Sequence, residues 1–347
     1  MVCAITAVLP GSASAEPAGV ARDGGAGVER VSVTADGAQA DGSSTGGAIT
    51  TDGSRVVFSS SAKNLTPGNS AGDERVYLRD QGSGQLKHVG SYPIASPVIS
   101  GDGEYAAYGV LLFRDTKVKL AQWTAGSSIG LNCDALNCSQ PSLSGDGRYV
   151  ANVATVGRPS SSQRIDVWDW HANTKQELAW FDHTAPSRPS ISGDGRFVAY
   201  QDGKAGDVFV WDRDYGATSD PIEGPAKEAT LVQISKDGGK VVYRSGSDTY
   251  VHDVSSGAAQ LVPDVKGLAI DPTGNHLLYV PNDPTGPSLV LRDLRTGTDE
   301  VVSNRPASAG IDAVSAGGRD VVFQSTADDI VPGDTNGTSD VFVRHLS

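Results

Sequence analysis

The sequence predicts an all-β fold, a seven-bladed β-propeller of four-stranded blades. A phrase centred on a tight glycine turn recurs seven times along the 347 residues, with the turn glycines 36 to 50 residues apart. That spacing suits one four-stranded propeller blade. Frequent Gly and Pro residues, which interrupt helices, and the lack of a 3.6-residue apolar period argue against helices. The chain also begins with the strand that its last copy lacks.

Each copy divides into four strands joined by turns. In the fourth copy, residues 189–192 form a first strand and residues 196–200 alternate as a second strand. A third strand follows at 207–211 (DVFVW), and other copies show a fourth, as at 85–89, 176–181 and 300–303. The turn between the first two strands suits Asp-Gly, because Gly takes positive φ without steric cost and Asp tolerates it. We therefore expect a structural turn role for Asp52, Gly53, Asp102, Gly103, Asp146, Gly147, Asp194, Gly195, Asp237 and Gly238.

The two ends of the repeat array predict how the ring closes. The last copy stops after its third strand, near residue 346, whereas residues 27–33 (GVERVSV) look like the fourth-strand segment 297–303. Pairing residues 30–33 beside 340–344 would complete the last blade and cover two exposed sheet edges. We therefore expect residues 28–347 to form a single propeller domain, preceded by a linker at 16–27.

Charge and hydropathy exclude several classes of partner. The chain has 28 Lys and Arg against 41 Asp and Glu, a formal charge of −13. This balance argues against nucleic acid and against an anionic membrane surface, since both attract basic proteins. No apolar run near 18 residues follows residue 15, so we expect no membrane span.

The first fifteen residues differ from the rest and predict export. They form an apolar stretch that ends in small residues, with Ala13 and Ala15 in an A-x-A arrangement. This pattern is typical of a secretory signal peptide, although the basic start of such a signal is missing, which suggests a truncated one. The alternative is an apolar N-terminus with no targeting role. We expect a secreted, cell-envelope or periplasmic protein.

Cysteine usage agrees with export. After Cys3, which would leave with the signal, only Cys133 and Cys138 remain, separated by four residues. An oxidising compartment favours a small disulfide loop between them. Free thiols are the alternative, and a zinc site is disfavoured because two thiols without a neighbouring His supply too few ligands.

The repeat itself resembles a known family. An S-x-D-G turn, an alternating strand and then a DVFV-type strand resemble the WD40-like β-propeller repeat of the TolB type. Residues 326–346 (TADDIVPGDTNGTSDVFVRHL) match closely, residues 61–80 are more divergent, and the resemblance covers residues 28–347. It implies a platform for partners, a companion of protease domains or, in some cases, a lyase. We expect no N-terminal α/β domain of the kind TolB carries. The resemblance of the repeat therefore does not imply the role of TolB in the Tol–Pal translocation system.

Few residues point to chemistry. A G-x-S-x-G match at 68–72 falls in a repeat loop with no helix after it, and the six His residues are scattered, so we expect no catalytic residue and no bound cofactor. The loop at 334–340 places Asp334, Asn336 and Asp340 around a Gly, which makes it a candidate calcium site. An Asx-turn loop is the alternative. The five Trp residues are expected to pack between blades, with carbohydrate stacking as the alternative.

Two functions follow from these observations. The first is an exported, non-enzymatic scaffold, expected to be a monomer, that binds a protein or glycan partner through loops on one face. The second is a propeller enzyme of lyase or lactonase/hydrolase type acting on an extracellular polymer at the central channel. The first is favoured because the second needs converging His, Asp and Glu residues that the repeats do not supply. The longest departures from the repeat, at 59–73, 113–138, 157–164 and 216–228, are the expected partner-binding segments.

Overall fold

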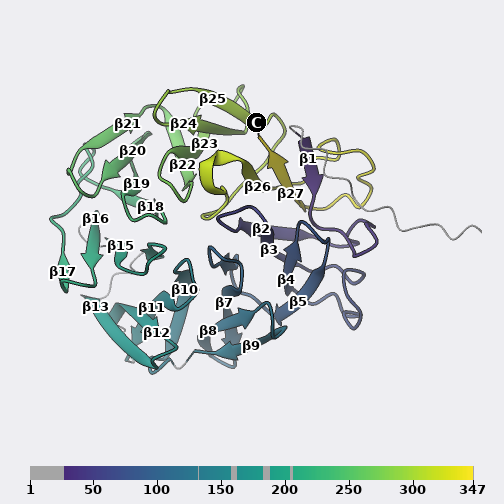
Figure 1. The fold of residues 1–347 in the computed structure, drawn as a ribbon, viewed down its shortest axis with the longest axis horizontal. Coiled ribbons are helices and arrows are strands. Elements are labelled where there is room, and N and C mark those ends of the chain that lie inside the picture. Colours follow the sequence, from purple (N-terminus) through teal and green to yellow (C-terminus); the bar gives the residue numbers. More distant parts are fainter. Residues whose placement is uncertain (1–26, 132, 158–161, 183–187, 204–205, 347) are drawn as a thin grey trace, which may run out of the picture.

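Seven antiparallel sheets surround a common axis (Figure 1). The computed structural model describes residues 27–131, 133–157, 162–182, 188–203 and 206–346. The predicted signal peptide and nearly all of the linker lie outside the described residues. The predicted all-β, seven-bladed propeller is confirmed, and the one helical element described is a short 3-10 turn, η1 (Ala316–Gly318).

Blades 1 to 6 are four-stranded sheets whose strands pair in sequence order. Blade 1 contains β2 (Ser44–Ile49), β3 (Arg55–Ser60), β4 (Arg75–Asp80) and β5 (Leu86–Ser91). Blade 2 contains β6 (Val98–Ile99), β7 (Tyr105–Leu112), β8 (Asp115–Gln122) and β9 (Ser127–Gly130). Blade 3 contains β10 (Asn137–Leu143), β11 (Tyr149–Val156), β12 (Ser162–Asp169) and β13 (Thr174–Asp182).

The next three blades repeat this arrangement. Blade 4 contains β14 (Ser190–Ile191), β15 (Phe197–Asp202), β16 (Asp207–Asp212) and β17 (Ala217–Thr218). Blade 5 contains β18 (Thr230–Ile234), β19 (Lys240–Ser245), β20 (Asp248–Asp253) and β21 (Ala259–Val262). Blade 6 contains β22 (Val265–Ile270), β23 (His276–Pro281), β24 (Leu289–Asp293) and β25 (Asp299–Ser303).

Blade 7 is built from both ends of the chain. It joins β26 (Asp320–Ser325) and β27 (Asp340–His345) to β1 (Gly27–Arg30), which lies antiparallel to β27 (Figure 1). The predicted closure is thus confirmed, with the closing strand three residues earlier than expected. The innermost segment of this blade pairs with β26 only through isolated bridges such as Val314 to Val321. Its extended run is interrupted because Asp312 has a left-handed backbone, with φ of 56°.

Ionic contacts hold the closing strand. The Nδ1 atom of His345 lies 2.7 Å from Asp320 Oδ1, and its Nε2 atom lies 3.9 Å from Glu29 Oε2 on β1. Asp320, and then Glu29, raise the pKa of His345 to about 9. The imidazole is therefore a cation at neutral pH, and it links β1 to both other strands of the blade.

The hydrophobic core lies between blades rather than inside any one of them. One buried cluster joins Leu78 of blade 1 to Ile99 and Tyr108 of blade 2, and another joins Phe58 of blade 1 to Phe342 of blade 7. Alternation along each strand explains this, because successive side chains point to opposite faces of a sheet. Each blade therefore buries both faces only when its neighbours are present.

The turn that opens each repeat has the same hydrogen bonds in five blades. In blade 3, Ser144 Oγ donates to Asp146 Oδ1 at 2.7 Å and accepts the Tyr149 backbone N–H at 2.9 Å. Gly147 completes this turn with φ of 70°. The corresponding hydroxyl–carboxylate pairs are Thr50–Asp52, Ser100–Asp102, Ser192–Asp194 and Ser235–Asp237. The aspartates act on their own turns, which accounts for their recurrence.

These turns also contact one another around the axis. Gly145 N–H donates to Gly193 O at 2.7 Å, and Gly193 N–H donates to Lys236 O at 2.6 Å. The remaining contacts of this ring are Thr51 to Gly101, Asp102 to Gly145, Asp237 to Pro272, Gly317 to Asp271 and Ala316 to Thr51. A Cβ atom on Gly193 would lie 2.8 Å from Lys236 O, so the ring requires glycine there. The repeated turns therefore fix both the hairpins and the spacing of the blades.

Candidate functional site

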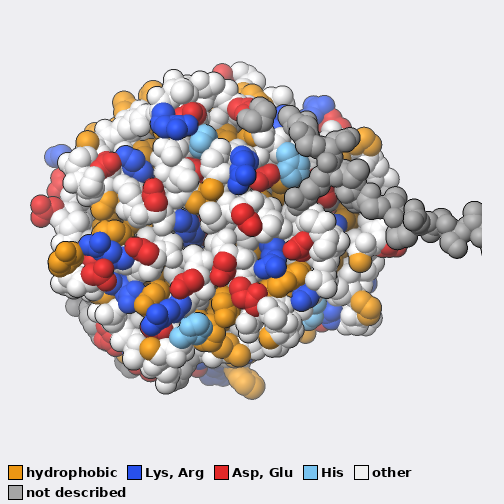
Figure 2. All heavy atoms as spheres, viewed as in Figure 1, with side chains coloured by type: hydrophobic (Ala, Val, Ile, Leu, Met, Phe, Trp, Pro, Cys, Tyr) orange, Lys and Arg blue, Asp and Glu red, His pale blue; other side chains and the backbone are white. Residues whose placement is uncertain are grey.

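Exposed apolar side chains gather in one part of the ring. Nine large hydrophobic residues of the described chain are exposed, and six of them lie between residues 92 and 129. Phe113 is fully exposed, and Tyr92 is 60% exposed. Exposed apolar side chains that cluster mark interaction sites more often than isolated ones do. Elsewhere, the face in Figure 2 carries interspersed acidic and basic side chains.

Two segments bring these side chains together. The link from blade 1 to blade 2 runs beside β7, with a bridge between Pro93 and Val110 and a hydrogen bond from Ile94 N–H to Gly109 O at 2.9 Å. A side chain at Gly109 would meet Ile94, since a Cβ atom there would lie 3.1 Å from Ile94 Cγ1. We call the resulting surface the apolar rim. It consists of Tyr92, Ile94, Leu111, Leu112 and Phe113.

The backbone of the rim is strained at its two aromatic residues. Tyr92 and Phe113 have φ of 58° and 59°, in the left-handed region that bulky side chains rarely adopt. Such conformations cost about 1–3 kcal/mol each and concentrate at binding and catalytic sites. The fold therefore maintains two exposed rings in an unfavourable conformation at the same place.

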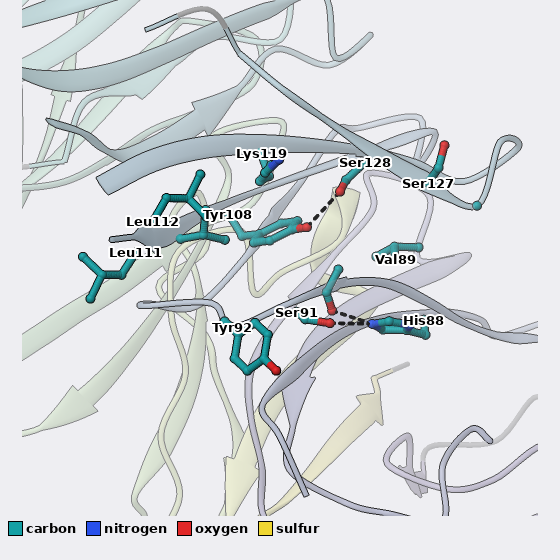
Figure 3. Close-up of a pocket in the computed structure, with 13 residues that line it drawn as sticks. His88, Val89, Ser91, Tyr92, Tyr108, Leu111, Leu112, Lys119, Ser127 and Ser128 are labelled. Atoms are coloured by element: carbon teal, nitrogen blue, oxygen red, sulfur yellow. Dashed lines mark hydrogen bonds between the residues drawn. The ribbon is translucent and has the colours of Figure 1, made fainter. Parts of the chain in front are cut away.

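A pocket of about 380 Å³ opens beside the rim, between the outer strand of blade 1 and the strands of blade 2 (Figure 3). Apolar side chains such as Val89, Val110 and Leu112 line it. Tyr108 OH donates to Ser128 Oγ at 3.2 Å, as Figure 3 shows. His88 Nε2 lies 2.8 Å from Gly90 O and 3.1 Å from Ser91 Oγ. We call this cavity the rim pocket.

The charge of the rim pocket is unlike that of the whole protein. Its lining includes none of the 41 acidic residues, whereas Lys119 belongs to it. Burial, and then the charge of Arg75, lower the pKa of His88, so its imidazole is neutral at pH 7. Lys119 is therefore the single charged side chain of the lining, and within the described chain it forms no ion pair. The pocket can offer a cation and an apolar wall to a ligand.

The central channel holds a second polar cluster, which the repeats did not predict. Gln233 Nε2 donates to Asp312 Oδ1 at 2.8 Å, and Lys236 Nζ lies 3.2 Å from the same oxygen. Lys236 also donates to Leu143 O at 3.1 Å. Blades 3, 5 and 7 are not neighbours, so these contacts cross the axis of the ring. Asp312 is 6% exposed, and its Oδ2 atom has no hydrogen-bond partner in the described structure.

Arg188 adds a further charge near this cluster. Burial lowers the pKa of its guanidinium, and the charge of Asp312 opposes that shift. Among the described residues, the channel thus brings the basic groups of Lys236 and Arg188 close to one buried carboxylate, that of Asp312. Across the described residues, no group of three or more His, Cys, Asp or Glu is placed to hold a metal ion.

The candidate calcium residues lie at the ring closure. Arg30 Nη2 lies 3.1 Å from Asp334 Oδ2, and Arg30 Nε lies 3.4 Å from Asp340 Oδ2. Gln39 Nε2 donates to both carboxylates, at 2.8 and 2.7 Å. The Asn336 amide donates to Ala40 O at 2.9 Å, across the same closure. A calcium ion would have to displace the guanidinium, so calcium binding remains a prediction that a calcium titration of the melting temperature would test.

The predicted disulfide residues lie just before and within β10. Cys133 and Cys138 are joined by a disulfide in the structure, with their Cα atoms 6.2 Å apart. Asp134 between them forms ion pairs with Arg164 at 2.8 Å and Lys175 at 2.6 Å, which anchor the loop to blade 3. This loop is therefore fixed to its own blade and is a poor candidate for a mobile binding element.

The structure also places the Trp residues and the four long segments that the sequence suggested as binding elements. Trp123, Trp168 and Trp211 are buried against neighbouring blades, which rules out carbohydrate stacking on these three side chains. The side chain of Trp180 lies outside the described residues. Of the four long segments expected to contact a partner, the one at 113–138 begins in the apolar rim, and the one at 157–164 lies partly outside the described residues. No described helix is long and apolar enough to cross a membrane.

Comparison with known proteins supports the fold alone. No family model matches the sequence, and no curated protein matches it. Among solved structures, an oligogalacturonate lyase in complex with manganese is 14% identical, with a TM-score of 0.67, and the match covers 94% of each chain. TolB from Acinetobacter baumannii is 17% identical, with a TM-score of 0.51, and the match covers 73% of this chain and 64% of that one. These likenesses confirm the TolB-like propeller fold expected from the repeats.

Proposed function

We propose that this protein is an exported, non-enzymatic β-propeller that binds a protein partner through the apolar rim and the rim pocket. The observation that carries this proposal is the gathering of five exposed apolar side chains, two of them on strained backbone, beside a pocket that three of them (Tyr92, Leu111 and Leu112) line. A propeller suits such a role because packed blades present a largely pre-formed surface. The signal-like N-terminus and the cysteine pair support export.

The apolar rim can supply substantial binding energy. Leu111 and Leu112 are 56% and 44% exposed, and Phe113 is fully exposed. Burying a large apolar side chain contributes about 1.5–3 kcal/mol, and an exposed fraction near one half leaves about 1 kcal/mol for each leucine. Loss of one such contact therefore weakens binding by roughly fivefold, since 1.4 kcal/mol corresponds to a factor of ten. A charge placed there costs more, because it would be buried without a partner.

Capture by the immobilised protein tests this proposal. The parent protein, the Leu112→Asp variant and the Leu261→Asp variant are each exposed to the exported proteins of the native organism. Leu261 is the matched control, because it is a leucine with similar exposure (49%) on blade 5. We expect one partner, retained in stoichiometric amounts, to be lost with Leu112→Asp and kept with Leu261→Asp at unchanged melting temperatures. Equal retention by both variants would contradict the proposal.

The enzymatic alternative has a specific experimental signature. The channel cluster around Asp312 is the one place where a buried carboxylate with an unpartnered oxygen lies beside basic groups in the described structure. An oligogalacturonate substrate with manganese, the pair in the name of the lyase neighbour, is the appropriate probe. Turnover that Asp312→Asn abolishes, while Leu112→Asp leaves it intact, would replace the scaffold with a propeller enzyme.

A further inference from the structure

We infer that the segment bound at the apolar rim is an extended acidic peptide of a partner protein, with an Asp or Glu beside large apolar side chains. This inference rests on the proposed function and adds the chemistry of the partner. Its basis is the juxtaposition of Lys119 with the apolar walls of a pocket that contains no carboxylate. In a chain of net charge −13, a pocket lined by a lysine and no carboxylate differs from the acidic remainder of the protein and favours an acidic group on a ligand.

The surroundings of Lys119 leave its ammonium group available. Lys119 on β8 pairs in register with Gly130 on β9. Because Gly130 has no side chain, β9 does not cover the lysine, and a Cβ atom there would lie 3.6 Å from Lys119 Nζ. On the other side, Lys119 lies opposite Tyr108 of β7, which carries no charge to pair with it. A cross-strand Asp or Glu at that place would neutralise the lysine. The nearby Lys117 differs, since its amine donates to Ala135 O and Leu136 O at 3.0 and 3.3 Å.

The nature of the rim favours a peptide over a glycan. Three of its five side chains are aliphatic, namely Ile94, Leu111 and Leu112. Sugar rings are held by flat aromatic faces and many hydrogen bonds, whereas aliphatic groups favour apolar side chains through the hydrophobic effect. A carboxylate on the same segment would meet Lys119, so alternating acidic and apolar residues fit both features of the site.

The concave shape and the charge argue against a membrane. A pocket of about 380 Å³ accepts inserted side chains, and Lys119 lies in its lining instead of at the tip of the hairpin. An anionic lipid surface would also repel a protein of charge −13. A partner peptide can place one carboxylate in the pocket without approaching the acidic remainder of the surface.

Peptide selection tests the inference directly. The probe is a phage-displayed library of random twelve-residue peptides, selected on the intact protein and counter-selected on Leu112→Asp. We expect enriched sequences with Asp or Glu adjacent to Leu, Ile, Phe, Tyr or Trp. Binding of a synthetic enriched peptide should weaken about tenfold with Lys119→Gln and should also weaken with added salt. The Lys266→Gln control, at an exposed lysine of blade 6, should leave binding unchanged.

The outcomes separate this inference from the proposed function. Enriched peptides that are apolar but not acidic, lost with Leu112→Asp and indifferent to Lys119→Gln, would overturn the inference and leave the scaffold intact. Enrichment of basic peptides, or no enrichment at all, would also overturn it. Parallel assays use a glycan array, zwitterionic lipid vesicles and size-exclusion chromatography. If the protein binds a glycan or a vesicle, or self-associates, in a way that Leu112→Asp abolishes, and if it binds no peptide, the rim has another occupant and the inference is overturned.

Discussion

Replacing Asp340 by alanine should loosen the closure of the ring. Asp340 is fully buried on β27, where it accepts hydrogen bonds from Ser32 Oγ at 2.6 Å and Gln39 Nε2 at 2.7 Å. It also lies 3.4 Å from the Nε atom of Arg30, the last residue of the closing strand. The substitution therefore removes the carboxylate on which three groups from the N-terminal segment converge.

The magnitude follows from the groups left behind. Removing one partner of a buried ion pair costs about 3–5 kcal/mol, and each buried donor left unsatisfied costs about 1–3 kcal/mol. Arg30 keeps a second carboxylate, Asp334, at 3.1 Å, which offsets part of the loss. We therefore expect a loss of about 3 kcal/mol in the free energy of unfolding. For a domain of about 320 residues, an unfolding entropy of about 2.1 cal/mol/K per residue converts that loss into a melting temperature lower by about 4–5 °C.

Calorimetry and hydrogen exchange check this expectation. The control is Asp328→Ala, which removes an exposed carboxylate in the segment between β26 and β27 and should change stability by less than about 0.5 kcal/mol. In Asp340→Ala the amides of β27 should exchange faster, because β1 no longer protects that edge. If Asp340→Ala has the same melting temperature as Asp328→Ala, and its β27 amides exchange at the parent rates, the assigned role of Asp340 in closure is wrong.

Three further predictions concern the ring, the cysteines and pH. Gly193→Ala should lower the melting temperature by several degrees, because its Cβ atom would lie 2.8 Å from the carbonyl oxygen of the next turn, while Gly310→Ala, with open space around it, should not. Exported, non-reduced protein should be two hydrogens lighter than the reduced form and should resist thiol labelling, and stoichiometric labelling of Cys133 and Cys138 would exclude the disulfide. Because the pKa of His345 rises from 6.5 to about 9 on folding, its contribution is complete below pH 6.5 and disappears as pH rises through about 9. The melting temperature should fall across that window, and a His345→Gln variant that falls equally would show that another group is responsible.

The sequence was sufficient for the architecture because the propeller is encoded locally and repeatedly. Each turn is specified within six residues, as when the Ser144 hydroxyl donates to Asp146 and accepts the Tyr149 backbone N–H within a single hairpin. Seven glycine turns fix the number of blades, five of them with this hydroxyl–carboxylate pair, and the fourth-strand pattern at the N-terminus indicates the closure. The closing strand lies three residues earlier than predicted, at Gly27–Arg30, and its register, with Arg30 opposite Phe342, was not predicted. Its selection depends on contacts with β27, more than 300 residues away.

The candidate site depends on packing between segments distant in the sequence, which the repeat pattern does not predict. The apolar rim exists because the link containing Tyr92 and Ile94 lies against β7, and the segment flagged at 113–138 contributes only its first residue, Phe113. Likewise, the channel cluster joins Gln233 to Asp312 across the ring, a pair 79 positions apart in the chain. Local sequence therefore determined the strands, turns and blade count, because those rest on hydrogen bonds between near neighbours. The tertiary structure alone decided which side chains stay exposed and which charges meet, because burial and Coulomb energies depend on distances in space.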